Sequence, residues 1–174
     1  MPVEVSCDVK GAARYVRTVR TEAQALMDLL KAQRVELSLL LTGDRRIAQL
    51  NREYRHKRGP TDVLSFGQID HAPREPAQAA KRAPLEINKL LGDVVISIDT
   101  AARQAGELDQ SVGRRLRTLL VHGVLHLMGF DHERPDDARL MFAVAHSFEA
   151  RLTEARGKPR RSSDKLFTKA RTAK

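Results

Sequence analysis

The most constraining feature of this chain is a run of eleven residues, 122–132, that holds three of its six histidines. The run reads His-Gly-Val-Leu-His-Leu-Met-Gly-Phe-Asp-His. On a helix, residues four apart lie on one face, so the imidazoles of His122 and His126 can converge on one point. Gly129 can adopt the left-handed conformation that ends a helix, and the reversal would bring His132 toward the other two. The spacing therefore predicts a helix, a glycine turn and a three-histidine metal site. The other three histidines lack such a setting and are expected to be loop or surface residues: His56, His71 and His146.

The ligand set indicates which chemistry such a site supports. Its frame matches the metzincin signature H-E-x-x-H-x-x-G-x-x-H, but Gly123 stands where the zinc peptidases have their general base. Three neutral imidazoles leave the full charge on a zinc ion, which favours an anionic substrate such as a phosphate ester and lowers the pKa of a bound water to roughly 7. Nickel, cobalt or copper would also accept these ligands. The alternative is three structural histidines on a buried helix, which explains neither the spacing nor the glycine.

Length and composition predict one cytoplasmic domain with a tail. The chain has 174 residues and one cysteine, Cys7, so an intramolecular disulfide is excluded. No apolar run is long enough for a membrane span or a signal peptide. Of the net charge of +9, residues 156–174 carry +7. We therefore expect a folded domain over residues 1–155 and a basic, disordered tail, which could either hold RNA through counterion release or be solvated without a dedicated role.

Hydrophobic periodicity predicts alternating strands and helices. Strands are expected near residues 2–8, 34–41, 61–66 and 90–98, the last of them central in the sheet. Helices are expected over a stripe from Tyr15 to Leu30, from an N-cap at Asp44 through Tyr54, near residues 99–107 and 112–128, and from Pro135 through Leu152. Residues 67–89 show no periodicity and predict a long loop. The pattern predicts a single α+β domain, with a small mixed sheet and the histidine helix near its core.

Three blocks of the sequence resemble the bacterial ribosomal-RNA maturation endoribonucleases, the YbeY family. The histidine block matches the pattern H-G-x-L-H-L-x-G-[YF]-D-H at every position. The second block runs from Leu50–Arg55 to Pro60–Phe66, and the third is Leu91–Ser97. The resemblance covers roughly residues 34–150 and leaves the basic tail outside it.

The resemblance implies a zinc-dependent, single-strand-specific endoribonuclease in ribosomal RNA maturation and ribosome quality control. The implied partners are single-stranded ribosomal RNA and the ribosome or a small-subunit ribosomal protein, with no membrane. His122, His126 and His132 would be the metal ligands. Arg55 would be the functional arginine, because a planar guanidinium can hold two phosphate oxygens; taken alone, Arg55 would be an ordinary solvated residue. The alternatives are a zinc peptidase and a ribosome assembly factor with a structural metal.

Overall fold

The structure is a computed structural model that describes residues 3–67 and 90–157. Its four strands form one sheet in the order β1-β2-β4-β3. The strands are β1 (Val3–Cys7), β2 (Glu36–Thr42), β3 (Val63–Gly67) and β4 (Leu90–Ser97). β1, β2 and β4 run parallel, whereas β3 pairs antiparallel with β4. The predicted mixed sheet is confirmed, and β4 is central because it pairs along both of its edges.

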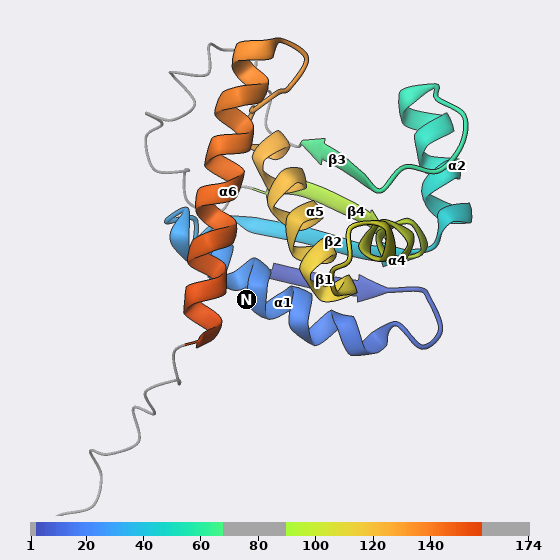
Figure 1. Cartoon of the computed structure of the whole chain (residues 1–174). Coiled ribbons are helices and arrows are strands. Elements are labelled where there is room, and N and C mark those ends of the chain that lie inside the picture. Colours follow the sequence, from blue (N-terminus) through green and yellow to red (C-terminus); the bar gives the residue numbers. More distant parts are fainter. Residues whose placement is uncertain (1–2, 68–89, 158–174) are drawn as a thin grey trace, which may run out of the picture.

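Helices cover both faces of this sheet (Figure 1). The described helices are α1 (Ala13–Leu29), α2 (Asp44–Arg55), α4 (Ile98–Glu107), α5 (Val112–Leu127) and α6 (Pro135–Gly157). α1, α5 and α6 gather on one face, with α5 directly against β3 and β4, and α4 packs against α5. α2 covers the opposite face, where Ile47 packs with Leu64 and Val95. The predicted α+β domain is thus confirmed.

α5 lies at the centre of the main hydrophobic core, as its apolar sequence predicts. Nine of its 16 residues are buried, so neighbours surround it on most sides. One of the nine is charged: Arg117 donates a 2.9 Å hydrogen bond to Glu22 of α1 and a 2.7 Å bond to Thr153 of α6. The buried ion pair thus links α5, which carries two of the histidines, to α1, and the bond to Thr153 links α5 to α6.

Gly123 allows α5 to approach the sheet closely. A Cβ atom at this position would lie 2.7 Å from Cγ1 of Val94 in β4, closer than real contacts allow. The hydroxyl of Ser65 in β3 donates a 3.0 Å hydrogen bond to the carbonyl of Gly123. The glycine therefore faces the sheet and not the space in which a metal ion would lie.

One expectation from the sequence is wrong, because Asp44 does not cap α2. The N-cap is Gly43, and Asp44 is the first residue of the helix. Its backbone N–H donates a 2.9 Å hydrogen bond to the carboxylate of Asp99, which is 55 residues away in the sequence. The Asp44 carboxylate instead accepts hydrogen bonds from Ser97, Thr100 and Arg103. A local capping rule cannot anticipate partners supplied by α4 and the residue before it.

Two predicted segments lie outside the described residues. Of the expected loop over residues 67–89, the structure describes only Gly67, the last residue of β3. Of the expected tail over residues 156–174, it describes only the last two residues of α6. None of the described helices combines the length and the apolar character that crossing a bilayer requires.

Candidate metal centre

The three histidines of the sequence motif lie together at the carboxyl end of α5. The helix ends as predicted: Met128 is the C-cap, and Gly129 follows in the left-handed region with φ of 87°. The N–H of Phe130 then donates a 3.0 Å hydrogen bond to the carbonyl of Leu125, which closes the turn, and the ring of Phe130 is buried. This anchored reversal returns the chain so that His132 lies beside the two helical histidines.

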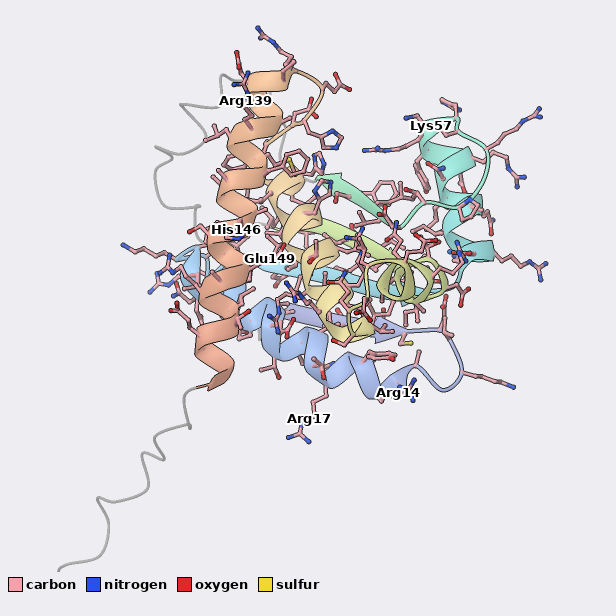
Figure 2. The ribbon with its side chains drawn as sticks, viewed as in Figure 1. Arg14, Arg17, Lys57, Arg139, His146 and Glu149 are labelled. Carbon is pink, nitrogen blue, oxygen red and sulfur yellow. The ribbon has the colours of Figure 1, made fainter. Side chains whose placement is uncertain are left out.

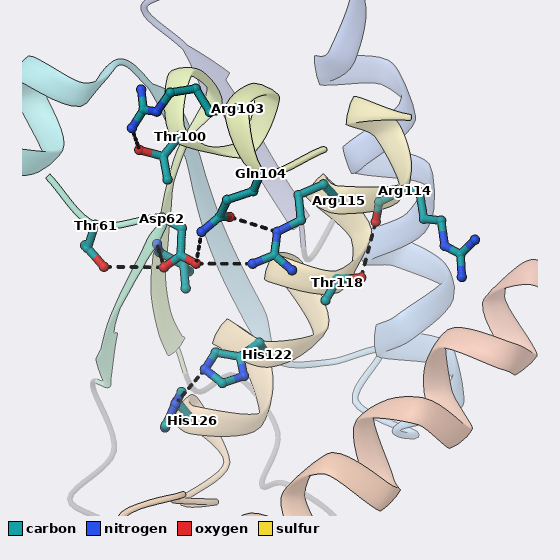
Figure 3. Close-up of polar contacts among 11 residues, drawn as sticks. Thr61, Asp62, Thr100, Arg103, Gln104, Arg114, Arg115, Thr118, His122 and His126 are labelled. Atoms are coloured by element: carbon teal, nitrogen blue, oxygen red, sulfur yellow. Dashed lines mark hydrogen bonds and ion pairs between the residues drawn. The ribbon is translucent and has the colours of Figure 1, made fainter. Parts of the chain in front are cut away.

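The ligand atoms of His122, His126 and His132 all lie within 4.8 Å of one another. The Nε2 atoms of His122 and His126 are 3.1 Å apart (Figure 3). Two imidazole nitrogens on one tetrahedral zinc ion would be about 3.3 Å apart, given Zn–N bonds of about 2.0 Å. His122 and His126 are half-buried and His132 is exposed, so the cluster opens to solvent. The donor set and its spacing fit a transition metal.

The surroundings favour the neutral, metal-binding form of the imidazoles. Burial, followed by the neighbouring charges of His126 and His132, lowers the pKa of His122 to about 4. Burial and then His132 also lower the pKa of His126. A metal ligand must be deprotonated, so at neutral pH these two side chains have no proton to lose before they bind an ion.

A polar network beside His122 joins β3, α4 and α5 (Figure 3). Asp62 accepts hydrogen bonds from the Thr61 hydroxyl, the Val63 N–H, the Gln104 amide and the Arg115 guanidinium. Arg115 also donates a 2.8 Å bond to Gln104 Oε1. Sequence reasoning did not single out Asp62 or Arg115. The available signal was that Asp62 lies in a matched block and that Arg115 precedes His122 by two helical turns.

Arg55 is the last residue of α2, on the far side of β3 from α5. Its side chain is exposed, and its charge makes a small contribution to lowering the pKa of His126, after burial and His132. The positive charge of Arg55 is therefore close enough to His126 to disfavour protonation of that ring slightly. His56, Lys57 and Arg58 follow it and are exposed, and Figure 2 shows Lys57 extending from this end of the molecule. The basic end of α2 faces solvent near the cluster.

Of the other three histidines, the structure describes His56 and His146, and neither belongs to the cluster. His56 ends α2 in the left-handed conformation and is exposed, as predicted for a loop residue. His71 lies outside the described residues. His146 is exposed on α6, as predicted for a surface residue, but it also lines a cavity of about 290 Å³ between α5 and α6. His122 forms part of the wall of the same cavity.

Known proteins similar to this chain agree on one family. The family model described as endoribonuclease YbeY matches residues 4–153. The endoribonuclease YbeY of Anaeromyxobacter sp. (strain Fw109-5) is 44% identical over 157 residues, which are 90% of this chain and 73% of that protein. The endoribonuclease YbeY of Aquifex aeolicus (strain VF5) is 40% identical over 142 residues, 80% of this chain and 86% of that protein.

A solved structure also has this fold. The solution structure of TM1509 from Thermotoga maritima superposes with a TM-score of 0.59 over 94% of this chain and 97% of its own. The two sequences are 22% identical, so this likeness bears on the fold alone.

Proposed function

This chain belongs to the endoribonuclease YbeY family, and from that membership we propose that it cleaves single-stranded ribosomal RNA in a metal-dependent hydrolysis. The family establishes a nuclease that acts on RNA. Single-strand specificity, a role in ribosomal RNA maturation and quality control, a ribosomal partner and a zinc cofactor are parts of the proposal. The observation that carries metal dependence is the convergence of three imidazoles within 4.8 Å.

In this proposal His122, His126 and His132 hold the ion. When bound, a zinc ion would supply Lewis-acid stabilisation of phosphate charge and would make a water molecule more acidic. The three side chains contribute no negative charge, so they do not repel a phosphodiester. The partial burial of His122 and His126 lowers the pKa of both rings and so favours their neutral form. The anchored turn at Gly129 holds the third ring, so the site needs little rearrangement to bind an ion.

Arg55 has the role of binding the scissile phosphate. It ends α2, its charge contributes slightly to the lowered pKa of His126, and its side chain is exposed and so available to RNA. A guanidinium can donate two parallel hydrogen bonds to phosphate oxygens and can stabilise the charge that develops as the P–O bond breaks. The exposed basic residues next to Arg55 would extend this contact along the RNA backbone.

The position of Gly123 supports a nuclease over a zinc peptidase. A peptidase with this ligand frame needs a glutamate after the first histidine, as the base that accepts a proton. Here that position faces Val94 of β4, and there is no room even for a Cβ atom. The remaining alternative, an assembly factor with a structural metal, predicts a metal-loaded protein that does not cut RNA.

The test compares three substrates: a single-stranded RNA, the same sequence as a duplex, and casein. We expect chelator-sensitive cleavage of the single strand only, and about one metal ion per chain by elemental analysis. His126→Ala should remove both the metal and the cleavage, whereas the exposed His146→Ala should keep the metal. Stoichiometric metal without RNA cleavage would favour the assembly factor, and cleavage of casein would favour the peptidase.

A further inference from the structure

The cavity between α5 and α6 adjoins the candidate metal centre. It measures about 290 Å³, and His122 lies in its wall, together with Asp62 and Arg115. The opposite wall is one face of α6, where Phe142, His146 and Glu149 recur at helical spacing. His146 and Glu149 are shown in Figure 2. Any group that fills this cavity therefore lies next to a phosphate held at the histidines.

The two carboxylates of the cavity differ in their availability. Asp62 already accepts hydrogen bonds from Thr61, Val63, Gln104 and Arg115, so its oxygens are committed to the fold. The carboxylate of Glu149 accepts a single hydrogen bond among those described, which the Thr118 hydroxyl donates to Oε2 over 3.1 Å. Oε1 and the second lone pair of Oε2 remain available to accept hydrogen bonds from a ligand.

The remaining walls suit an aromatic ring with a phosphate on one side. Phe142 is 59% exposed, although a large apolar side chain is normally buried, and it borders the cavity. Unpaired RNA bases stack on such rings. Arg115 is held by Asp62 and Gln104, and its Nη1 atom makes no hydrogen bond among those described, so it can face the sugar-phosphate of a bound nucleotide. Aromatic, cationic and anionic groups thus border one cavity.

We propose that this cavity binds the base of the nucleotide adjacent to the scissile phosphate, and that it selects an unpaired guanine. The inference rests on the proposed RNA cleavage at the histidine site. The base stacks on Phe142, and its Watson–Crick edge meets Glu149. Arg115 lies on the side of the cavity nearer the phosphate.

The preference for guanine follows from the hydrogen-bond donors that each base offers to a carboxylate. Its Watson–Crick edge presents the N1–H and N2–H groups side by side, and these match the two oxygens of Glu149. Uracil offers one donor between two carbonyl oxygens, which a carboxylate repels. Adenine and cytosine each place a ring-nitrogen acceptor beside their amino group, so they can donate to one oxygen only. A matched pair of hydrogen bonds discriminates between bases by roughly tenfold or more.

The test uses oligouridylates that carry one guanosine, placed at each position in turn. We expect the cut to fall at a fixed distance from the guanosine, with kcat/KM about tenfold above the all-uridine parent. In Glu149→Gln, kcat/KM for the guanosine-containing oligonucleotide should exceed that for the all-uridine parent by only about threefold or less, because an amide cannot accept two donors side by side. Phe142→Ala should raise KM for all of the oligonucleotides more than it lowers kcat, since stacking tolerates any base. Thermal melting of both variants measures whether they fold as stably as the wild type.

Glu154→Gln is the matched control, because Glu154 is an exposed glutamate of α6 that does not line the cavity. It should keep the full preference for guanosine. Fluorescence anisotropy of the same oligonucleotides, with chelator present, measures binding independently of cleavage. Failure of the wild type to cut any RNA would overturn the proposed function, while the anisotropy would still report on the cavity. Equal cleavage and binding of all oligonucleotides, or an unchanged preference in Glu149→Gln, would overturn the guanine site.

Discussion

At the residue scale, Gly123 has two effects: it takes the place of the glutamate that a zinc peptidase has beside its first histidine, and it lets α5 pack closely on the sheet. In the sequence, this glycine indicates the loss of a catalytic base. The structure adds a packing reason, because position 123 points at Val94 and Ser65 of the sheet. A larger residue would force α5 away from β4. The same glycine therefore disfavours a peptidase base and sets the distance between the histidine helix and the sheet.

Gly123→Ala should destabilise the protein by about 1–3 kcal/mol, the usual cost of overpacking a core. The new Cβ would lie 2.7 Å from a short, stiff valine that cannot move aside. The free energy of unfolding from urea titration measures this effect. Gly113→Ala in the same helix is the control, because nothing lies within 4 Å of its added Cβ, and it should be neutral or stabilising by up to about 1 kcal/mol. Val94→Ala, added to the Gly123→Ala variant, should recover part of the lost free energy of unfolding. If the double variant recovers none of it, the steric explanation is wrong.

Arg55→Ala should lower kcat/KM for RNA about 100-fold, the typical cost of removing a group that stabilises transition-state charge. Metal content and melting temperature should not change, since Arg55 is exposed and ends its helix. Arg55→Lys should recover little activity, because an ammonium cannot form the paired hydrogen bonds of a guanidinium. Arg45→Ala, at the other end of α2, is the matched control. Wild-type turnover in Arg55→Ala would remove Arg55 from the mechanism.

At the scale of the elements, periodicity could predict which segments form helices and strands, because burial on one face repeats along each of them. The stripe from Tyr15 to Leu30 belongs to α1, and the apolar run over residues 90–98 belongs to β4. Contacts between elements could not be predicted in this way. Asp44 was assigned to its own helix, but its carboxylate binds α4 instead, since those partners become neighbours only after the sheet has formed.

Asp44 gives the link between α2 and α4 a dependence on pH. Burial alone would raise the pKa of Asp44, but hydrogen bonds from Ser97, Thr100 and Arg103 outweigh it and lower the pKa below its usual value. The unfolded chain then binds a proton more readily than the folded one, so stability falls as the pH drops below about 4. In Asp44→Asn this loss should be smaller, and stability at pH 7 should be lower by about 1–3 kcal/mol.

Urea denaturation at pH 7, 4 and 3 measures the contribution of Asp44. Asp136→Asn is the matched control, since the side chain of Asp136 is 91% exposed and its partner, Arg139, is exposed as well. It should change stability little at any of these pH values. If Asp44→Asn and the wild type lost stability in parallel below pH 4, the link would not depend on the charge of Asp44.

At the scale of the whole molecule, the convergence of His122, His126 and His132 could be predicted because the three residues lie within eleven residues of sequence. The cavity beside them could not. Its walls come from the segment before β3, from α5 and from α6, so they are distant in the sequence. His146 was interpreted as a surface residue, which is correct for its exposure, but nothing in the sequence places it beside His122. Sites built from one segment leave a sequence signature, whereas sites shared between helices do not.

Deletion of residues 156–174 tests the proposed division into a nuclease domain, residues 1–155, and a basic tail. These residues carry +7 of the net charge of +9. If the tail adds a diffuse electrostatic contact, the deletion should weaken RNA binding and flatten the plot of log Kd against log salt concentration. Cleavage at saturating RNA should be nearly unchanged. An identical salt slope with and without the tail would show that it takes no part in binding.

The position of β4 between β2 and β3 has a consequence for how the protein folds during synthesis. β2 and β3 leave the ribosome before β4 and do not pair with each other in the native sheet, so until residues 90–97 emerge β2 can pair only with β1 and β3 has no partner strand. Until then each has an unpaired edge, which is the kind of surface through which nascent chains aggregate. α5 packs on β3 and β4. The histidine cluster at the end of α5 therefore rests on the completed sheet, so the cleavage proposed for it would belong to the finished domain and not to a partly synthesised chain.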